Sequence, residues 1–360
     1  MGILLTAIGA MLLFAVLLDR GKVTFLEGEL HPERKRSFCA FAAGIWTILS
    51  GLRHLSIGAD TMAYGYSFLR DANTPWGEII RNIIATYRGD DFIKDPAYPL
   101  IEKAVHELGG DYRTLLILIA VLFFGSMGVW VCRHSRVPVV SFLLFSTLFY
   151  SFFAFTGQRQ TIATALVVFM GDGLIRRRKL VWFLLLVLAA STIHKSCICF
   201  VPAYFLYPVR NYSRQAYVAA IGAGLILLLF SAPLWEHIGT WLHYESFLTN
   251  DIGGTGTYVF LFFLVLAITV VQFPFIVRND PDAYGTLNMI GFGSLMVAMS
   301  YVNQSFMRVQ QYYSLYLMLL LPEIILSFKP KHQLLVAGTG CGLLLLFFIL
   351  NRPAYLFFWQ

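Results

Sequence analysis

A histidine and a lysine, His194 and Lys195, lie side by side within the otherwise apolar stretch 180–208. Ionisable groups are costly inside hydrocarbon, so a pair of them needs partners or a function. Two arginines, Arg159 and Arg308, lie at comparable points beside other apolar segments. Arginine and lysine both bind phosphate oxygens, arginine through paired N–H donors and lysine as a point charge. Together these positions predict a binding site for an anion.

The composition indicates that the elements around these cations are membrane helices. Hydrophobic residues make up 58% of the chain and charged residues 13%, whereas soluble domains carry about 25% charged residues. Many apolar runs approach the ~20 residues that cross a bilayer. We therefore predict an all-α, polytopic protein with about 11–12 transmembrane helices, forming a single integral membrane domain over residues 1–360.

The distribution of basic residues predicts how the chain is oriented. Lysines and arginines gather in the short connections between apolar segments, which places those connections in the cytoplasm. Successive connections lie on opposite sides of the membrane. All basic connections then fall on the cytoplasmic side only if 180–208 forms a short helical hairpin that turns at His194 and Lys195. Arg159, Arg308 and the long polar segment 56–112 then face the extracytoplasmic side.

The polar segment 56–112 contains a second set of candidate residues. Apolar residues between Trp76 and Ile84 recur at helical spacing, which predicts an amphipathic helix lying on the membrane surface. Asp60 follows a membrane segment and could accept a proton from a hydroxyl group, although an aspartate there could equally cap a helix. Tyrosines in this loop could stack on sugar rings or belong to an interfacial aromatic belt.

Five motifs in this order resemble those of the EpsG/Wzy-like family of bacterial membrane polysaccharide polymerases. They cover about residues 55–325 and read Gly58-Ala-Asp60-Thr61-Met-Ala-Tyr64, Asp95-Pro96-Ala-Tyr98-Pro99-Leu-Ile-Glu102, Phe155-Thr-Gly157-Gln-Arg159-Gln-Thr-Ile-Ala163, Ile193-His194-Lys195-Ser196, and Phe306-Met-Arg308 followed by Tyr312-Tyr313 and Leu321-Pro322. The block around Arg159 followed by the one around His194 is the distinctive part. Ala59 departs from the family pattern, in which we expect threonine.

The resemblance implies a GT-C-like glycosyltransferase in the bacterial inner membrane, with its active site on the periplasmic face. Such enzymes join oligosaccharide repeat units that are carried on undecaprenyl diphosphate. Donor and acceptor are both linked to this lipid, and the donor releases its undecaprenyl diphosphate in the reaction. The resemblance also implies catalysis without a metal or cofactor, and a co-polymerase partner that regulates chain length. Nucleic acid need not be invoked as a partner, because a net charge of +7 suits anionic lipid.

Residue roles follow from combining this resemblance with the cationic positions. Arg159, Lys195 and Arg308 would hold the donor diphosphate, whose negative charge grows as it leaves. Asp60 or His194 would take the proton of the acceptor hydroxyl, with a slight preference for Asp60, while Arg159 also acts in catalysis. Secondary candidates for sugar contacts are Tyr64, Tyr98, Gln158, Gln160, Gln304 and Tyr312.

Other interpretations of the same residues stay open. Arginines at helix ends often extend to lipid headgroups, which is the alternative for Arg159 and Arg308. An O-antigen ligase would use the same donor, and a flippase would bind the same diphosphate, although no second copy of the His194 motif suggests the matched halves of a transporter. An acyltransferase with a buried histidine would need that histidine on the cytoplasmic side.

Overall fold

The computed structural model describes residues 1–20, 31–88, 95–230, 256–300 and 306–360. Helices make up 80% of it, and no strand occurs within those ranges. Backbone contacts divide the chain into two compact units, residues 1–198 with 338–360 and residues 199–337. The predicted all-α class of a polytopic membrane protein is confirmed.

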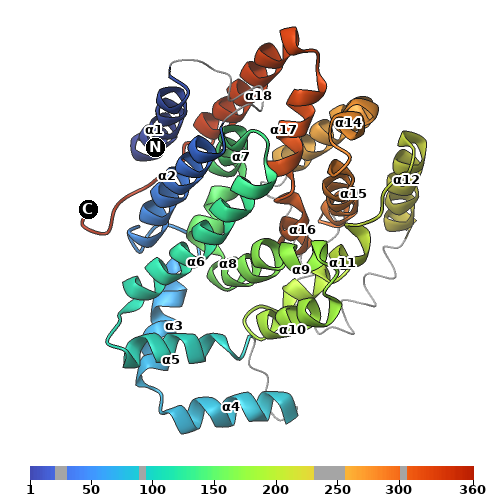
Figure 1. The fold of residues 1–360 in the computed structure, drawn as a ribbon. Coiled ribbons are helices and arrows are strands. Elements are labelled where there is room, and N and C mark those ends of the chain that lie inside the picture. Colours follow the sequence, from blue (N-terminus) through green and yellow to red (C-terminus); the bar gives the residue numbers. More distant parts are fainter. Residues whose placement is uncertain (21–30, 89–94, 231–255, 301–305) are drawn as a thin grey trace. The chain divides into compact units, whose positions relative to one another are not determined.

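The first unit contains the helices that carry most of the motifs (Figure 1). They are α1 (Gly2–Leu18), α2 (Pro32–Gly51), α3 (Thr61–Asn73), α4 (Trp76–Arg88), α5 (Tyr98–Glu107), α6 (Tyr112–His134), α7 (Pro138–Leu144), α8 (Gln158–Thr164), α9 (Asp172–Arg176) and α10 (Leu180–Ser191). Three π-helical segments, Phe145–Phe149, Ser151–Thr156 and Ala165–Met170, adjoin α7, α8 and α9.

The second unit follows a 3-10 turn at Lys195–Phe200, within which the boundary falls. Its helices are α11 (Ala203–Leu206), α12 (Arg214–Phe230), α14 (Gly256–Asn279), α15 (Ala283–Met299), α16 (Phe306–Ser314) and α17 (Leu317–Ser327). The last helix, α18 (Pro330–Leu350), contains the boundary back to the first unit.

Among the residues that the structure describes, three helices are long and apolar enough to cross a membrane, and they lie within Tyr112–His134, Tyr258–Asn279 and Pro330–Leu350. Six shorter apolar helical segments of 10–17 residues accompany them in the described ranges. In the stretch 180–208, α10 ends at Ser191, His194 lies in a turn, and the 3-10 turn begins at Lys195. The backbone therefore leaves α-helical geometry at the His194-Lys195 pair.

Aromatic packing between α2 and α6 forms the core of the first unit, where the two helices lie side by side (Figure 1). Trp46 on α2 is 1% exposed, and its indole N–H donates to Ser146 Oγ at 2.9 Å. The rings of Phe124 and Phe145 pack against it. Close approach of the helices requires a small residue, since a Cβ on Gly128 would lie 3.0 Å from that of Ala43. This core fixes α6 and the π-helical segments that lead to α8.

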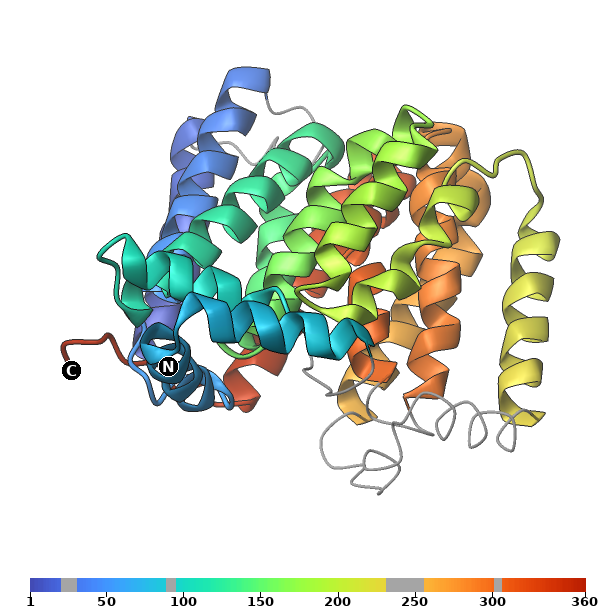
Figure 2. The same ribbon diagram turned by 90° about the horizontal axis from the view of Figure 1, so that it is seen from below.

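Segment 56–112 contributes three short helices to the same unit. The helix α3 packs against α5, while α4 runs crosswise in front of the longer helices in Figure 2. Ile79 on α4 is buried, but Trp76, Ile80 and Ile84 leave an apolar stripe that is 40–47% exposed. An amphipathic helix therefore forms where the spacing predicts one, and its place on the membrane surface stays a prediction.

Two glycines set the chain geometry around α8. A π-turn closes with the Gly157 N–H donating to the Phe152 carbonyl at 2.9 Å, and α8 begins at the next residue. A Cβ on Gly157 would lie 2.4 Å from the Phe152 ring. Gly58, at φ +94°, approaches Phe155 so closely that a Cβ would lie 2.1 Å from its carbonyl oxygen. The start of α3 is thereby held against the residues that precede α8.

Gly58→Ala should lower the thermal stability of the purified protein and reduce its activity. The substitution combines a left-handed backbone with a backbone clash, and the conformational strain alone costs about 1–3 kcal/mol. Gly77→Ala is the matched control, because open space surrounds Gly77 within α4. Equal melting temperatures of the two variants would contradict this account of Gly58.

Candidate functional site

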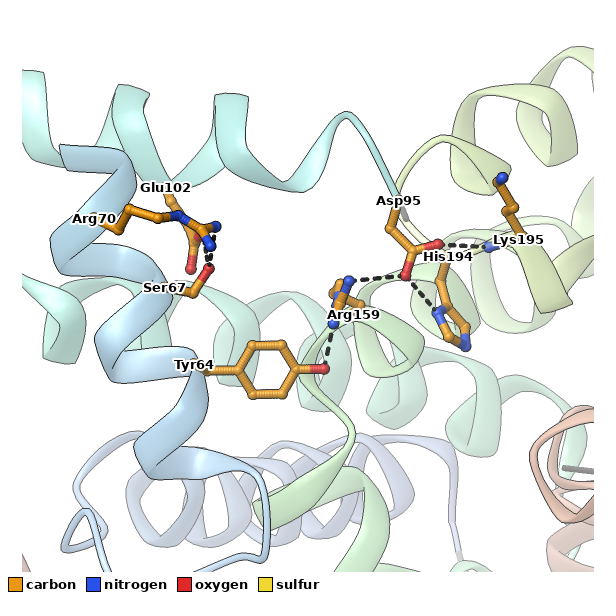
Figure 3. A network of polar contacts seen from close by, with 8 residues as sticks. All are labelled: Tyr64, Ser67, Arg70, Asp95, Glu102, Arg159, His194 and Lys195. Atoms are coloured by element: carbon orange, nitrogen blue, oxygen red, sulfur yellow. Dashed lines mark hydrogen bonds and ion pairs between the residues drawn. The ribbon is translucent and has the colours of Figure 1, made fainter. Parts of the chain in front are cut away.

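Asp95 is the centre of a polar cluster in the first unit (Figure 3). Its Oδ2 accepts a hydrogen bond from Arg159 Nη1 at 3.1 Å and lies 3.3 Å from His194 Nδ1. Its Oδ1 accepts from the backbone N–H of Lys195 at 3.1 Å. The residue is only 1% exposed, so these contacts replace water around the carboxylate. Three segments far apart in the sequence meet at one buried anion.

Backbone hydrogen bonds hold the segments of Asp95 and His194 together. Asp95 has a φ of +61° and begins a turn in which Tyr98 N–H donates to its carbonyl at 3.2 Å, just before α5. The Ala97 N–H donates to the Thr192 carbonyl at 2.9 Å. His194 N–H donates in turn to the Ala190 carbonyl at 2.9 Å, beyond the end of α10. The turn before α5 therefore docks directly onto the turn that carries the histidine.

The charge state of Asp95 is set by its surroundings. Burial alone would raise the pKa of this carboxyl, but the hydrogen bond and charge of His194, the charge of Arg159 and the Lys195 N–H hold the pKa below its ordinary value. When the His194 ring is uncharged, an ionised Asp95 favours the tautomer that carries its proton on Nδ1, and this tautomer has a lone pair on Nε2. This Nε2 is buried and has no hydrogen-bond partner within the described ranges.

Arg159 lies between the anion and two tyrosine rings. Its Nε donates to Tyr64 Oη at 3.3 Å, and its guanidinium lies 5.3 Å from the Tyr64 ring centroid and 5.7 Å from that of Tyr98. Cation–π attraction adds to the ion pair at such distances. The Arg159 side chain is still 28% exposed, so it is held in place and accessible at once.

A buried chain of hydrogen bonds supports the arginine from behind. Tyr98 Oη donates to Gln158 Oε1 at 3.0 Å, Gln158 Nε2 donates to Tyr112 Oη, and Tyr112 Oη donates to the Thr61 carbonyl at 2.9 Å. Tyr98 and Gln158 are 2% and 3% exposed. Their polar groups are therefore engaged with each other, which gives them a supporting place beside Arg159.

The other predicted site residues lie elsewhere. Asp60 is exposed at the N-terminal end of α3 and makes no side-chain capping bond. The Lys195 side chain points away from Asp95 in Figure 3, so its backbone rather than its ammonium joins the cluster. Gln160 is buried on α8.

Two of the predicted residues lie in the second unit. Arg308 is exposed and Tyr312 fully buried, both on α16. Gln304 lies outside the described residues. Within the described ranges, no group of three or more His, Cys, Asp or Glu side chains is placed to hold a metal ion.

A pair of buried carboxyl groups lies next to this cluster and was not anticipated. Glu102, one helical turn after Tyr98, is 0% exposed and accepts a hydrogen bond from Ser67 Oγ at 3.1 Å. Burial, together with a hydrogen bond to Asp71 and the charge of that residue, raises the pKa of Glu102 to about 9. Arg70 Nε donates to Asp71 Oδ1 at 2.7 Å. A raised pKa favours the protonated form of Glu102, and in that form Glu102 can donate to Asp71 and join α5 to α3.

Asp95 and Glu102 were not predicted as site residues, but each carried a signal in the sequence. The charge of Arg159 needs a compensating anion in an apolar environment and the polar ring of His194 needs a partner, and the motif that contains Asp95 also ends in Glu102. A search for counter-charges among the motifs would have suggested Asp95. Glu102 gave the weaker signal, because only its pairing with Asp71 distinguishes it from a surface glutamate.

Glu102→Gln should remove a pH-dependent loss of stability. A carboxyl whose pKa is raised on folding costs stability progressively as pH rises from its ordinary pKa toward about 9. The melting temperature of the wild-type protein in detergent should therefore fall between pH 5 and pH 9, and that of Glu102→Gln should fall less. Glu78→Gln, an exposed position on α4, should keep the wild-type slope. A shared slope for all three proteins would refute a protonated Glu102.

A scan against protein-family models gives a match that covers most of the chain. The family model described as the EpsG family covers residues 36–357, nearly the whole chain and every residue of the Asp95 cluster. Searches of curated proteins and of solved structures found no significant match. The resemblance that the ordered motifs indicate is thereby confirmed. The chain belongs to the EpsG family, as a membrane protein of the polysaccharide-polymerase type.

Proposed function

We propose that this protein is a glycosyltransferase of the Wzy type, which joins oligosaccharide units carried on undecaprenyl diphosphate at the extracytoplasmic face of the bacterial inner membrane. Family membership supports the class, and the Asp95 cluster supports the place of the reaction. The observation that carries the proposal is the buried carboxylate that contacts Arg159 and His194 Nδ1 together. It provides a fixed cation beside an imidazole whose buried Nε2 has no hydrogen-bond partner among the described residues.

The reaction needs an acceptor hydroxyl, a base and a stabilised leaving group. The hydroxyl of the acceptor sugar attacks the anomeric carbon of the donor, the bond from that carbon to the diphosphate oxygen breaks, and undecaprenyl diphosphate leaves. The hydroxyl proton passes to His194 Nε2. Arg159 stabilises the charge that develops on the diphosphate, because a preorganised cation needs no rearrangement during the reaction.

Among the predicted bases, the geometry favours His194 over Asp60. The contact between Asp95 and Nδ1 orients the ring and favours the tautomer that a base at Nε2 requires, as a second group does for catalytic histidines generally. Asp60, by contrast, is solvent-exposed at the start of α3, where its side chain makes no capping bond that would orient it. The Lys195 ammonium remains a proposed ligand of the diphosphate, and Tyr64 a proposed sugar contact beside Arg159. The role of Arg308, on α16 of the second unit, stays a prediction from the sequence.

Polymer formation from a purified lipid-linked repeat unit tests the assignment. Arg159→Lys should lower the rate by about 10²–10³-fold, as loss of a transition-state donor does, and His194→Gln by about 10²–10⁴-fold, as loss of a general base does. Matched controls are His106→Gln, exposed on α5, and Arg210→Gln, in an exposed ion pair with Asp282. Wild-type rates for both site variants would refute the proposal.

The same assay separates the competing functions. A polymerase needs only the lipid-linked unit as donor and acceptor, so a gel should show a ladder of increasing length. A ligase would leave single units unless lipid A core were added, and a flippase would move the unit between leaflets without forming a bond. Asp95→Asn should keep binding of the lipid-linked unit yet slow the ladder and displace its pH profile, because the imidazole loses its anionic partner.

Chemical labelling tests the proposed orientation. In a cysteine-free background, a membrane-impermeant maleimide applied to spheroplasts should label Gly77→Cys in α4. It should not label Lys179→Cys, which comes after α9 among the arginines and is also exposed. Lysed membranes should label both. The reverse pattern would place segment 56–112, and with it Asp95, in the cytoplasm.

A further inference from the structure

Two grooves run along α6, one on each flank of a shared ridge. The ridge consists of Val121, Gly125, Val129 and Arg133, which line both grooves. These residues succeed one another at intervals of four along the helix, so they form one line on its surface. One groove, of about 670 Å³, opens toward α2, and the other, of about 800 Å³, opens toward α9 and the segment before it. All of these elements belong to the first unit.

The length of the ridge matches one leaflet of a bilayer. The twelve-residue separation of Val121 and Arg133 on α6 corresponds to about 18 Å at the helical rise. Half of the hydrocarbon core of a membrane is about 15 Å thick. Since α6 is long and apolar enough to span a membrane, both grooves are expected to face acyl chains.

Along most of this length the walls are apolar. Ala40, Ala43 and Gly44 of α2 line the first groove. Phe169, Met170 and Trp130 line the second. A Cβ on Gly125 would have no atom within 4 Å, so the space over the ridge is open there.

The charges collect where the ridge ends. Arg133 belongs to both grooves, Arg36 of α2 lies at the same end of the first groove, and Arg177 after α9 lies in the second. The acid in the second groove, Asp172, is 2% exposed and already lies 3.0 Å from His134 Nε2 and 2.8 Å from Arg176 Nε. The exposed arginines Arg36, Arg133 and Arg177 therefore give this end a positive charge.

We propose that an anionic diacyl phospholipid binds astride α6, with one acyl chain in each groove and its phosphate at Arg133 between Arg36 and Arg177. A two-chain lipid fits two grooves that diverge from one ridge, and an anionic headgroup fits the cationic end they share. Arginine donates two parallel hydrogen bonds to a phosphate, which makes it suited to fix the headgroup. This lipid site shares no residue with the Asp95 cluster, and the proposal does not depend on the proposed transferase reaction.

Native mass spectrometry of the full chain in mild detergent tests the site. Phosphatidylglycerol, phosphatidylethanolamine with the same acyl chains, and a polyprenyl phosphate serve as probes. One phosphatidylglycerol should remain bound at least 10-fold more tightly than the zwitterionic lipid. The double variant Arg133→Gln, Arg177→Gln should lose about 10–30-fold of the phosphatidylglycerol affinity, since each basic residue near a membrane surface contributes to such binding.

Two further variants separate the headgroup from the chains. Lys179→Gln removes an exposed charge from the same basic run but lines neither groove, so it should bind like the wild type. Gly125→Leu fills the open space over the ridge. It should weaken the binding of both phospholipids equally and preserve the preference for the anionic one. Equal affinity for the two phospholipids, tighter binding of polyprenyl phosphate, or wild-type affinity of both the double variant and Gly125→Leu would overturn the proposal.

Discussion

The balance of charge at one buried carboxylate determines how the candidate site is built. Asp95 is almost inaccessible to water, so its charge requires donors from within the protein. Arg159 and His194 supply them, and each of these lies in apolar surroundings that demand an anion in return. The acid comes from segment 56–112 and its partners from two apolar segments. A polar loop and two apolar segments thereby acquire a common centre.

The support around this centre leaves the Arg159 side chain partly exposed and His194 Nε2 buried but without a hydrogen-bond partner among the described residues. Tyr98, Gln158 and Tyr112 use their polar groups on one another and lie behind Arg159. The arginine keeps part of its surface exposed, and His194 presents Nε2 on the side opposite its aspartate. The free energy needed to position these groups is spent during folding, so the site needs little reorganisation when charge moves within it.

The sequence predicts the class of the fold and two members of the Asp95 cluster, Arg159 and His194. It does not single out the carboxylate between them. Arg159 and His194 could be identified because a charge in an apolar segment is conspicuous. Asp95 stands in a polar loop, where an aspartate before proline is typical of a turn. Its role depends on a contact between residues about a hundred positions apart, which no local pattern encodes.

Other parts of the site could not be predicted from residue type alone. The aromatic and amide side chains of Tyr98 and Gln158 suit sugar recognition as well as they suit each other, and only burial distinguishes the two uses. Lys195 suggests a charged ligand by its side chain, yet its backbone N–H makes the contact with Asp95. The π-helical segments escape a search for helical periodicity, which assumes 3.6 residues per turn.

One of those π-helical segments affects how strictly the number of residues before α8 fixes the direction of Arg159. A π-turn accommodates one residue more than an α-turn, and the segment Ser151–Thr156 ends at Gly157, directly before the helix that carries Arg159. Because the wider turn absorbs that residue, loss of one residue within the segment would narrow it to α geometry and nearly preserve the direction in which α8 presents Arg159. Loss of a residue between Gly157 and Arg159 has no such compensation and would turn the arginine by about 100° away from Asp95. Relatives should therefore tolerate a gap within Ser151–Thr156 far better than one between the glycine and the arginine.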